Sequence, residues 1–282
     1  MSYGFRPWLQ TSWDARAAAN FIGGGIGSGL LVFAALSGAS GLALTRLSVA
    51  GLVFVAIGLA CVWAEIGRPL RAMNVFIHAR RSWMTREALV APLLFAAGAV
   101  AAVTQQPAFA WVTALFALAF VYCQARILRA AKGIPAWRDP RLTPFILATS
   151  LAEGAGLFWV CAWHHRAGTS TLLAVFGGLV IVRLVAWLAY RRSLGTAVAL
   201  PAIAALDRAG TVLQWLGTLP PLALVAFIAT GYAGETATLP LAAVAGASAL
   251  VAGAWAKATL VLRAAFNQGF ALPHLPVRGA RP

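Results

Sequence analysis

Eight segments of the sequence are long and apolar enough to cross a lipid bilayer, and this pattern constrains the fold more than any other feature. A transmembrane helix requires about 20 predominantly apolar residues, because the hydrocarbon core of a bilayer is about 30 Å thick. The segments comprise residues 17–38, 47–66, 88–105, 108–128, 143–164, 170–190, 214–234 and 240–263. We therefore predict an all-α, polytopic integral membrane protein, since backbone exposed to lipid must form its hydrogen bonds within helices.

The amino-acid composition excludes the soluble classes of protein. Hydrophobic residues make up 61% of the chain and charged residues only 10%, whereas soluble domains are about half apolar and about a quarter charged. The net charge of +15 is typical of nucleic-acid-binding proteins, but here the charges lie in short clusters between apolar segments. A soluble enzyme, a disordered chain and a nucleic-acid-binding module are therefore excluded.

The basic residues predict the orientation in the membrane, because lysine and arginine are concentrated in cytoplasmic loops. An even number of helices places both termini on one side. Of the 22 basic residues, 18 lie on that side, whereas only Arg46 and Arg166 lie on the other and Arg183 and Lys257 lie within helices. We therefore predict that both termini are cytoplasmic, in a bacterial inner membrane. The longer loops, residues 67–87, 126–142 and 191–213, face the same side.

We expect a single membrane domain, residues 1–282, arranged as two four-helix bundles. Residues 27–30 (GSGL) resemble residues 154–157 (GAGL), which also indicates a parallel duplication with halves 1–142 and 143–282. Glycines spaced four residues apart near the first of these motifs permit close packing of helices. A nucleotide-binding loop is not expected there, because it requires a preceding strand.

Few ionisable residues lie in the predicted helices, and each is a candidate for function or for pairing. Glu65, Glu87 and Glu153 lie in or at the membrane. Glu153 is the deepest, at about 15 Å from the side of the termini, from 1.5 Å per helical residue. Two interpretations of Glu153 stay open: a proton-transferring or quinone-facing acid, or a structural ion pair with Arg183 or Lys257.

Polar and aromatic residues are concentrated just before and at the start of the third predicted helix. A quinone headgroup needs a slot open to lipid, flat apolar walls, donors for its two carbonyls and a nearby proton carrier. We predict a quinone site formed by Glu87, Trp83, Arg86, His78 and Arg71, with proton transfer by Glu87 and Glu153. The alternatives are a carboxylate at the positive end of the helix for Glu87 and an interfacial belt residue for Trp83.

The loop 126–142 mixes basic residues with prolines and a tryptophan. Attraction to anionic lipid would explain the basic residues, but it does not require prolines or tryptophan. Arginine and tryptophan are enriched in the hot spots of protein interfaces, so we predict docking of a soluble partner subunit. The predicted docking residues are Arg80, Arg81, Arg126, Arg129, Trp137 and Arg138.

The histidines and cysteines predict neither haem nor a metal site in this chain. Haem b needs two axial histidines on different helices at similar depth. His164 and His165 are adjacent at a helix end, and His78 and His274 lie in a loop and a tail. The three cysteines are far apart in the sequence and form no C-x-x-C motif.

Two motifs carry a resemblance to a known family. Residues 82–87 (SWMTRE), at the end of an arginine-rich loop, and residues 124–137 of the next such loop resemble the DmsC/NrfD-like membrane anchors of molybdopterin oxidoreductase complexes. Residues 3–14 (YGFRPWLQTSWD) are similar to one branch, the membrane subunits of phenylacetyl-CoA:acceptor oxidoreductases. The resemblance covers essentially the whole chain.

The resemblance implies a membrane subunit that exchanges electrons with quinone, menaquinone or ubiquinone, and holds no haem or metal. The implied partners are a ferredoxin-like iron–sulfur subunit with four clusters and a catalytic subunit with molybdenum or tungsten bound to molybdopterin. The implied reaction is the oxidation of phenylacetyl-CoA to phenylglyoxylate.

By the same resemblance, the interfacial acid of the family corresponds to Glu87, with Trp83 and Arg86 beside it and Arg68 and Arg71 in the preceding loop. The alternatives are an anchor of the dimethyl-sulfoxide-reductase type that oxidises quinol, and a secondary transporter with its site around Glu153.

Overall fold

The computed structural model of the chain describes residues 6–65, 75, 82–161, 169–196 and 198–269. Helices cover 83% of these residues, and no strand occurs among them. One isolated antiparallel bridge joins Leu9 and Phe266. The predicted all-α fold class is confirmed for this part of the chain.

The described ranges contain eight spans that are long and apolar enough to cross a membrane, as the sequence predicts. The short helix α5 (Pro135–Arg138) lies between the fourth and fifth spans. The spans are α1 (Ala15–Leu36), α2 (Gly41–Glu65), α3 (Trp83–Thr104), α4 (Pro107–Ala130), α6 (Leu142–Cys161), α7 (Thr169–Ser193), the pair α8 (Leu200–Trp215) and α9 (Leu219–Ala229), and α10 (Gly234–Leu262). The chain is therefore a multi-pass membrane protein.

Polar residues and prolines set the starts of several helices. The Asp14 carboxylate caps α1 by accepting the N–H of Arg16 at 2.7 Å, and the hydrogen bond from the Arg16 side chain holds the pKa of Asp14 below its ordinary value. Ser82 caps α3 by accepting the N–H of Thr85 at 3.2 Å. Pro107 opens α4, where the missing N–H removes no helical hydrogen bond.

The seventh span starts earlier than the predicted segment 214–234. Helix α8 begins at Leu200, so most of the predicted loop 191–213 is helical. Asp207 and Arg208 lie in this stretch. In the structure, Asp207 accepts a hydrogen bond of 2.6 Å from Nε of Arg191 on α7.

The same span is broken between α8 and α9. Pro220 and Pro221 lie in the first turn of α9, where proline is tolerated. The side chain of Thr218 donates to the carbonyl of Leu213 at 2.8 Å, and the carbonyl of Gly217 accepts a hydrogen bond from Arg183. These contacts satisfy backbone groups that the break would otherwise leave unpaired.

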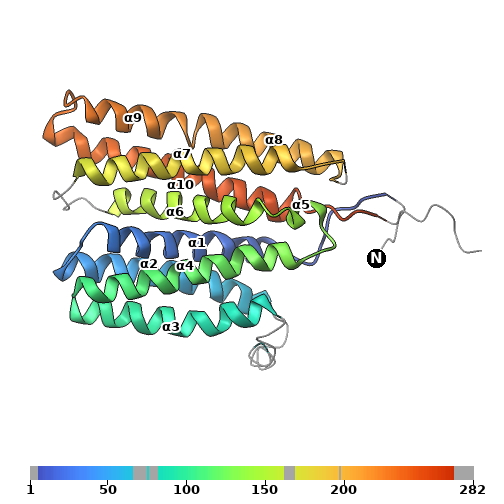
Figure 1. Cartoon of the computed structure of the whole chain (residues 1–282), viewed down its shortest axis with the longest axis horizontal. Coiled ribbons are helices and arrows are strands. Elements are labelled where there is room, and N and C mark those ends of the chain that lie inside the picture. Colours follow the sequence, from blue (N-terminus) through green and yellow to red (C-terminus); the bar gives the residue numbers. More distant parts are fainter. Residues whose placement is uncertain (1–5, 66–74, 76–81, 162–168, 197, 270–282) are drawn as a thin grey trace, which may run out of the picture.

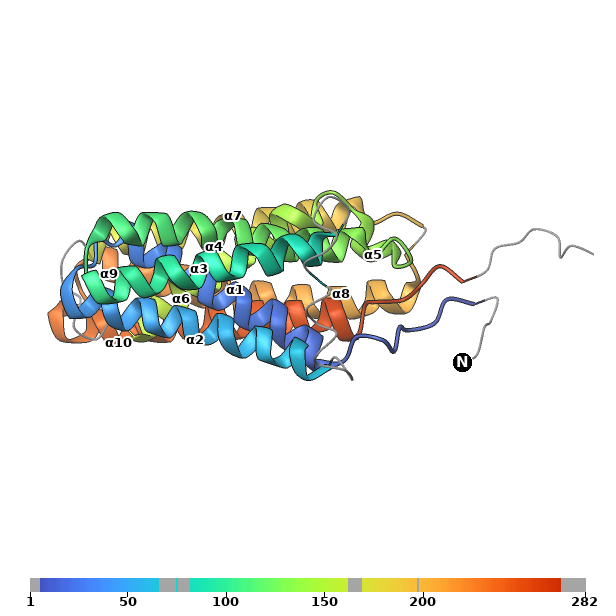
Figure 2. The ribbon, with the colours of Figure 1, turned by 90° about the horizontal axis from the view of Figure 1, so that it is seen from below.

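The spans run side by side in an elongated helical body, with α1 and α6 near its centre and α3, α8 and α9 at its edges (Figure 1; Figure 2). Helices α1 and α6 are the most buried spans. They cross at Gly29 and Gly154, where a methyl group on either residue would overlap the backbone of the other helix. The two similar motifs, GSGL and GAGL, therefore meet at this crossing.

Both terminal segments leave the same end of this body, which we call the terminal end (Figure 1). The connections α4–α5–α6 and α7–α8 lie there as well. Of the basic residues in the described ranges, only Arg46, at the start of α2, lies toward the opposite end. The basic residues are therefore segregated as the positive-inside rule expects for one side of a membrane.

Candidate functional site

A cavity of about 740 Å³ lies at the terminal end, between the segment before α1 and helices α1, α2 and α3. Its walls are mostly apolar and aromatic, and include Trp13, Phe21, Trp63, Met84 and Phe95. Trp63 and Met84 are 58% and 48% exposed, so the cavity reaches the outer surface of the bundle between α2 and α3. A flat apolar group can therefore enter it from the lipid phase.

Glu87 provides a buried carboxylate in this cavity. Its side chain lines the cavity and is 7% exposed. Its Oε1 atom accepts a hydrogen bond of 3.5 Å from Nδ2 of Asn20 on α1, which also lines the cavity. Ser82, rather than Glu87, caps the start of α3. The carboxylate thus faces the cavity, where it can exchange a proton with a bound group.

An amide network surrounds this carboxylate. Gln124 on α4 donates from Nε2 to the backbone carbonyl of Asn20 at 3.0 Å. In the described part of the chain, Oδ1 of Asn20 and Oε1 of Gln124 are buried without a hydrogen-bond partner. Each of these two oxygens can accept one further hydrogen bond. A bound group that donates to them would remove the cost of burying an acceptor without a partner.

Trp83 and Arg86 of the predicted quinone site are not among the residues that line the cavity. An α-helix turns by about 100° per residue, so the face of α3 that carries Met84 and Glu87 is not the face that carries Arg86. The guanidinium groups of Arg86 and Arg126 lie 4.1 and 4.4 Å from the ring centroid of Trp83. Trp83 and Arg86 therefore pack toward α4.

The structure describes only part of the predicted site and docking set. His78 and Arg71 of the predicted quinone site lie outside the described residues, as does Arg68. The same holds for the predicted docking residues Arg80 and Arg81.

The other predicted docking residues differ in their exposure. Arg126 and Arg129 are partly exposed, and Arg126 donates to the hydroxyl of Tyr122 at 2.8 Å. Arg138 is exposed and donates to Oε1 of Gln268 at 2.8 Å. The three arginines are thus accessible to a partner.

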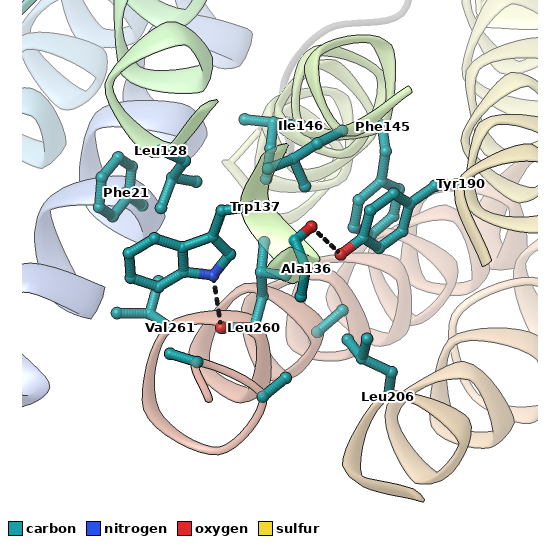
Figure 3. Close-up of a cluster of buried hydrophobic side chains, with 14 of the residues drawn as sticks. Phe21, Leu128, Ala136, Trp137, Phe145, Ile146, Tyr190, Leu206, Leu260 and Val261 are labelled. Atoms are coloured by element: carbon teal, nitrogen blue, oxygen red, sulfur yellow. Dashed lines mark hydrogen bonds between the residues drawn. The ribbon is translucent and has the colours of Figure 1, made fainter. Parts of the chain in front are cut away.

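Trp137 is instead a core residue, which corrects its predicted role as a docking contact. Its side chain is 1% exposed, and its Nε1 donates to the carbonyl of Leu260 at 3.0 Å (Figure 3). That carbonyl lies in the last turn of α10, where helical partners are missing. The hydroxyl of Tyr190 donates to the carbonyl of Ala136 at 2.8 Å (Figure 3). These bonds fix the loop to α7 and α10.

A second polar cluster lies within the bundle. Nζ of Lys257 on α10 is 2.6 Å from Oε2 of Glu153 on α6, and both side chains are at most 1% exposed. The same ammonium group donates to Oγ of Ser150 at 2.9 Å and to the carbonyl of Phe21 at 3.1 Å. Of the two partners considered for Glu153, Lys257 forms the ion pair.

Arg183 is fully buried, and its guanidinium binds backbone carbonyls rather than a carboxylate. It donates to the carbonyl of Ala249 at 2.7 Å and to that of Gly217. Oε1 of Glu153 and Nε of Arg183 have no hydrogen-bond partner in the described part of the chain. The cluster thus combines one acid with two bases inside a membrane bundle.

Asn20, Gln124 and Trp13 are site residues that the sequence analysis did not identify. Asn20 and Gln124 are single neutral amides in apolar segments, and neither carries a charge that would mark it in the sequence. An amide in a membrane helix is itself a signal, because it requires a hydrogen-bond partner from a neighbouring helix. Trp13 precedes the first predicted span, so only the tertiary structure brings it to the cavity.

No known family model matches this chain, and no curated protein matches it either.

Proposed function

We propose that this chain is the quinone-binding membrane anchor of an oxidoreductase complex. The observation that supports the proposal is the cavity at the terminal end, in which a buried carboxylate and an amide meet aromatic and apolar walls. Its volume of about 740 Å³ falls within the range of about 300–1,000 Å³ that is usual for pockets of small molecules and cofactors.

The chemistry of the cavity fits a quinone headgroup. A quinone takes up two electrons and two protons when it becomes a quinol. Nδ2 of Asn20 can donate a hydrogen bond to a carbonyl oxygen, and Oε1 of Glu87, 3.5 Å away, can hold and release a proton beside it. Trp13 and Phe21 offer flat faces against which a planar ring can pack.

Glu153 keeps a proposed secondary role in proton transfer. Its carboxylate is paired with Lys257, and the ammonium group of Lys257 contacts the carbonyl of Phe21. Phe21 is also a cavity wall, so the two polar clusters meet at α1.

We place the terminal end in the cytoplasm of a bacterium, with the chain in the inner membrane as two four-helix bundles. The segregation of basic residues supports this orientation.

The proposed partners are an iron–sulfur subunit and a molybdopterin subunit docked at the exposed arginines of that end. The proposed reaction of the complex is the four-electron oxidation of phenylacetyl-CoA with two water molecules to phenylglyoxylate and free CoA, while two quinones are reduced to two quinols. A CoA thioester is a cytoplasmic substrate, which agrees with this orientation. Protons and electrons then arrive from the same side, and turnover moves no net charge across the membrane.

The first test is purification of the tagged chain in mild detergent, with identification of co-purifying proteins and metal analysis. Recovery of an iron–sulfur subunit together with a molybdenum or tungsten subunit is the expected result, followed by assays with phenylacetyl-CoA and quinone. A chain that purifies alone and without iron, in a detergent shown to preserve such complexes, would contradict the proposal.

The second test replaces the cavity carboxylate. Glu87→Gln keeps the shape of the side chain and removes the buried carboxylate, while Glu65 also lines the cavity; because the proton carrier beside Asn20 is lost, we expect intact assembly and a fall in quinone turnover of about 100-fold or more. Glu235→Gln, at an exposed position in the first turn of α10, is the matched control. Equal turnover in the two variants would remove Glu87 from the site.

A secondary transporter is the second candidate, and the break between α8 and α9 favours it, since transporters use discontinuous helices. Arg183 binds the backbone at this break. The transporter hypothesis predicts substrate flux through liposomes that contain only this chain, and loss of that flux on replacement of Glu153.

A further inference from the structure

Residues 8–10, before α1, are paired with residues 265–267, after α10, beside the cavity. Residues 8–10 run antiparallel to residues 265–267, with one bridge and backbone hydrogen bonds of 3.0 and 3.1 Å. The backbone N–H of Trp8 also donates to Oδ1 of Asn267 at 3.2 Å. We call this pairing the clasp. It holds the segment before α1 against the end of α10.

Gln10 connects the clasp to the cavity wall. Its Oε1 accepts the backbone N–H of Trp13 at 2.7 Å, and its Nε2 donates to the carbonyl of Trp13 at 2.8 Å. Nε2 also contacts the carbonyl of Val261 at 3.3 Å. This carbonyl lies in the last turn of α10 and lacks a helical partner. One side-chain amide therefore binds both backbone groups of Trp13 and anchors them to α10.

The Trp13 ring stands between the cavity and the core of the terminal end. It stacks on Phe21 with ring centroids 5.8 Å apart and packs on Trp137 at 4.9 Å. Both Trp13 and Phe21 line the cavity. The packing behind Trp13 supports its ring, but the hydrogen bonds that hold its backbone come from Gln10.

We propose that Gln10 is a positioning residue, which holds Trp13 as a cavity wall and thereby sets the affinity for a quinone ring. This inference rests on the proposed quinone function. A planar ring gains binding energy from a flat aromatic wall only if that wall is held in place, since an ordering cost otherwise offsets the contact. Replacement of Gln10 removes the hydrogen bonds that hold the backbone of Trp13. The Trp13 ring is then less ordered, and the cavity binds a planar ring less tightly.

The test uses the complete complex with decylubiquinone and menadione as probes. Gln10→Ala is expected to raise KM and the dissociation constant about tenfold, the size of one aromatic contact, with a smaller change in kcat. Gln106→Ala is the matched control, because Gln106 lies at the opposite end and its side chain forms no capping bond. The control should bind both quinones like the unaltered complex.

A double-mutant cycle separates positioning from general stability. If Gln10 acts through Trp13, the double variant Gln10→Ala/Trp13→Ala binds no more weakly than Trp13→Ala alone. Additive losses would overturn the inference. If Gln10→Ala does not assemble, Gln10→Glu takes its place, because a carboxylate still accepts the N–H of Trp13 and lacks the donor.

The outcomes distinguish this inference from the function on which it rests. An unaltered complex that binds neither quinone removes the proposed function and the positioning role together. Normal quinone binding by the unaltered complex and by Gln10→Ala removes the positioning role alone.

Discussion

Removing one partner of the buried Glu153–Lys257 pair should destabilise the chain far more than removing both. The charged atoms are 2.6 Å apart, and the side chains are 0% and 1% exposed. A single replacement leaves a buried charge without its partner, which costs about 3–5 kcal/mol. Replacement of both charges by apolar or neutral groups of similar volume is often neutral. With a near-neutral double replacement, the two single losses give a coupling energy of about 6–10 kcal/mol in magnitude, above the range of about 0.5–3 kcal/mol that is usual for contacting residues.

Arg183 makes the two single replacements unequal. The buried cluster holds one carboxylate and two cations. Glu153→Gln leaves both cations without a carboxylate, whereas Lys257→Met leaves one carboxylate and one guanidinium. Arg183 also retains its backbone carbonyl partners in either case. We therefore expect Glu153→Gln to be the more destabilising of the two.

The assay is reversible unfolding in mixed micelles on titration with sodium dodecyl sulfate, followed by far-ultraviolet circular dichroism. Asp207→Asn is the control, because its ion pair with Arg191 is partly exposed and such pairs contribute about 0–1 kcal/mol. The reasoning is refuted if Glu153→Gln costs no more than the control, or if the effects of Glu153→Gln and Lys257→Met are additive.

Three further replacements test the packing and the buried hydrogen bonds of the bundle. Gly29→Ala would drive a methyl group into the backbone of α6, so we expect a loss of about 1–3 kcal/mol in the same unfolding assay. Gly178→Ala, with open space around the position, should be neutral or stabilising by up to about 1 kcal/mol. Trp137→Phe removes the indole donor and leaves a buried carbonyl of Leu260 unpaired, at a cost of about 1–3 kcal/mol. Full stability of Trp137→Phe would show that this carbonyl has another partner.

The membrane spans could be located from the sequence because hydrophobicity is a local property summed over about 20 residues. The prediction was wrong where local signals conflicted with tertiary pairing. The predicted loop 191–213 contains Asp207 and Arg208, yet α8 continues through both residues, and Arg191 on the neighbouring helix pairs with Asp207. A window of sequence contains no information on such a partner from another helix.

The candidate site could be predicted only in part. The carboxylate of Glu87 lies in the cavity, but Trp83 and Arg86, its neighbours in the sequence, pack elsewhere. Arg86 and Glu87 are adjacent in the sequence and therefore lie about 100° apart around the helix axis, so the two side chains of this motif point to different faces of α3. Glu153 was open to two partners, and only the relative rotation of α6, α7 and α10 selects Lys257.

The sequence alone determined that this chain is a helical, multi-pass membrane protein with its basic residues on one side. These properties follow from the transfer of side chains between water and lipid, which each segment undergoes by itself. The tertiary structure decided which polar groups share a cavity, because that depends on the rotation and crossing of packed helices. It alone brings Trp13, Asn20 and Glu87 together, and joins the segment before α1 to α10 through Gln10.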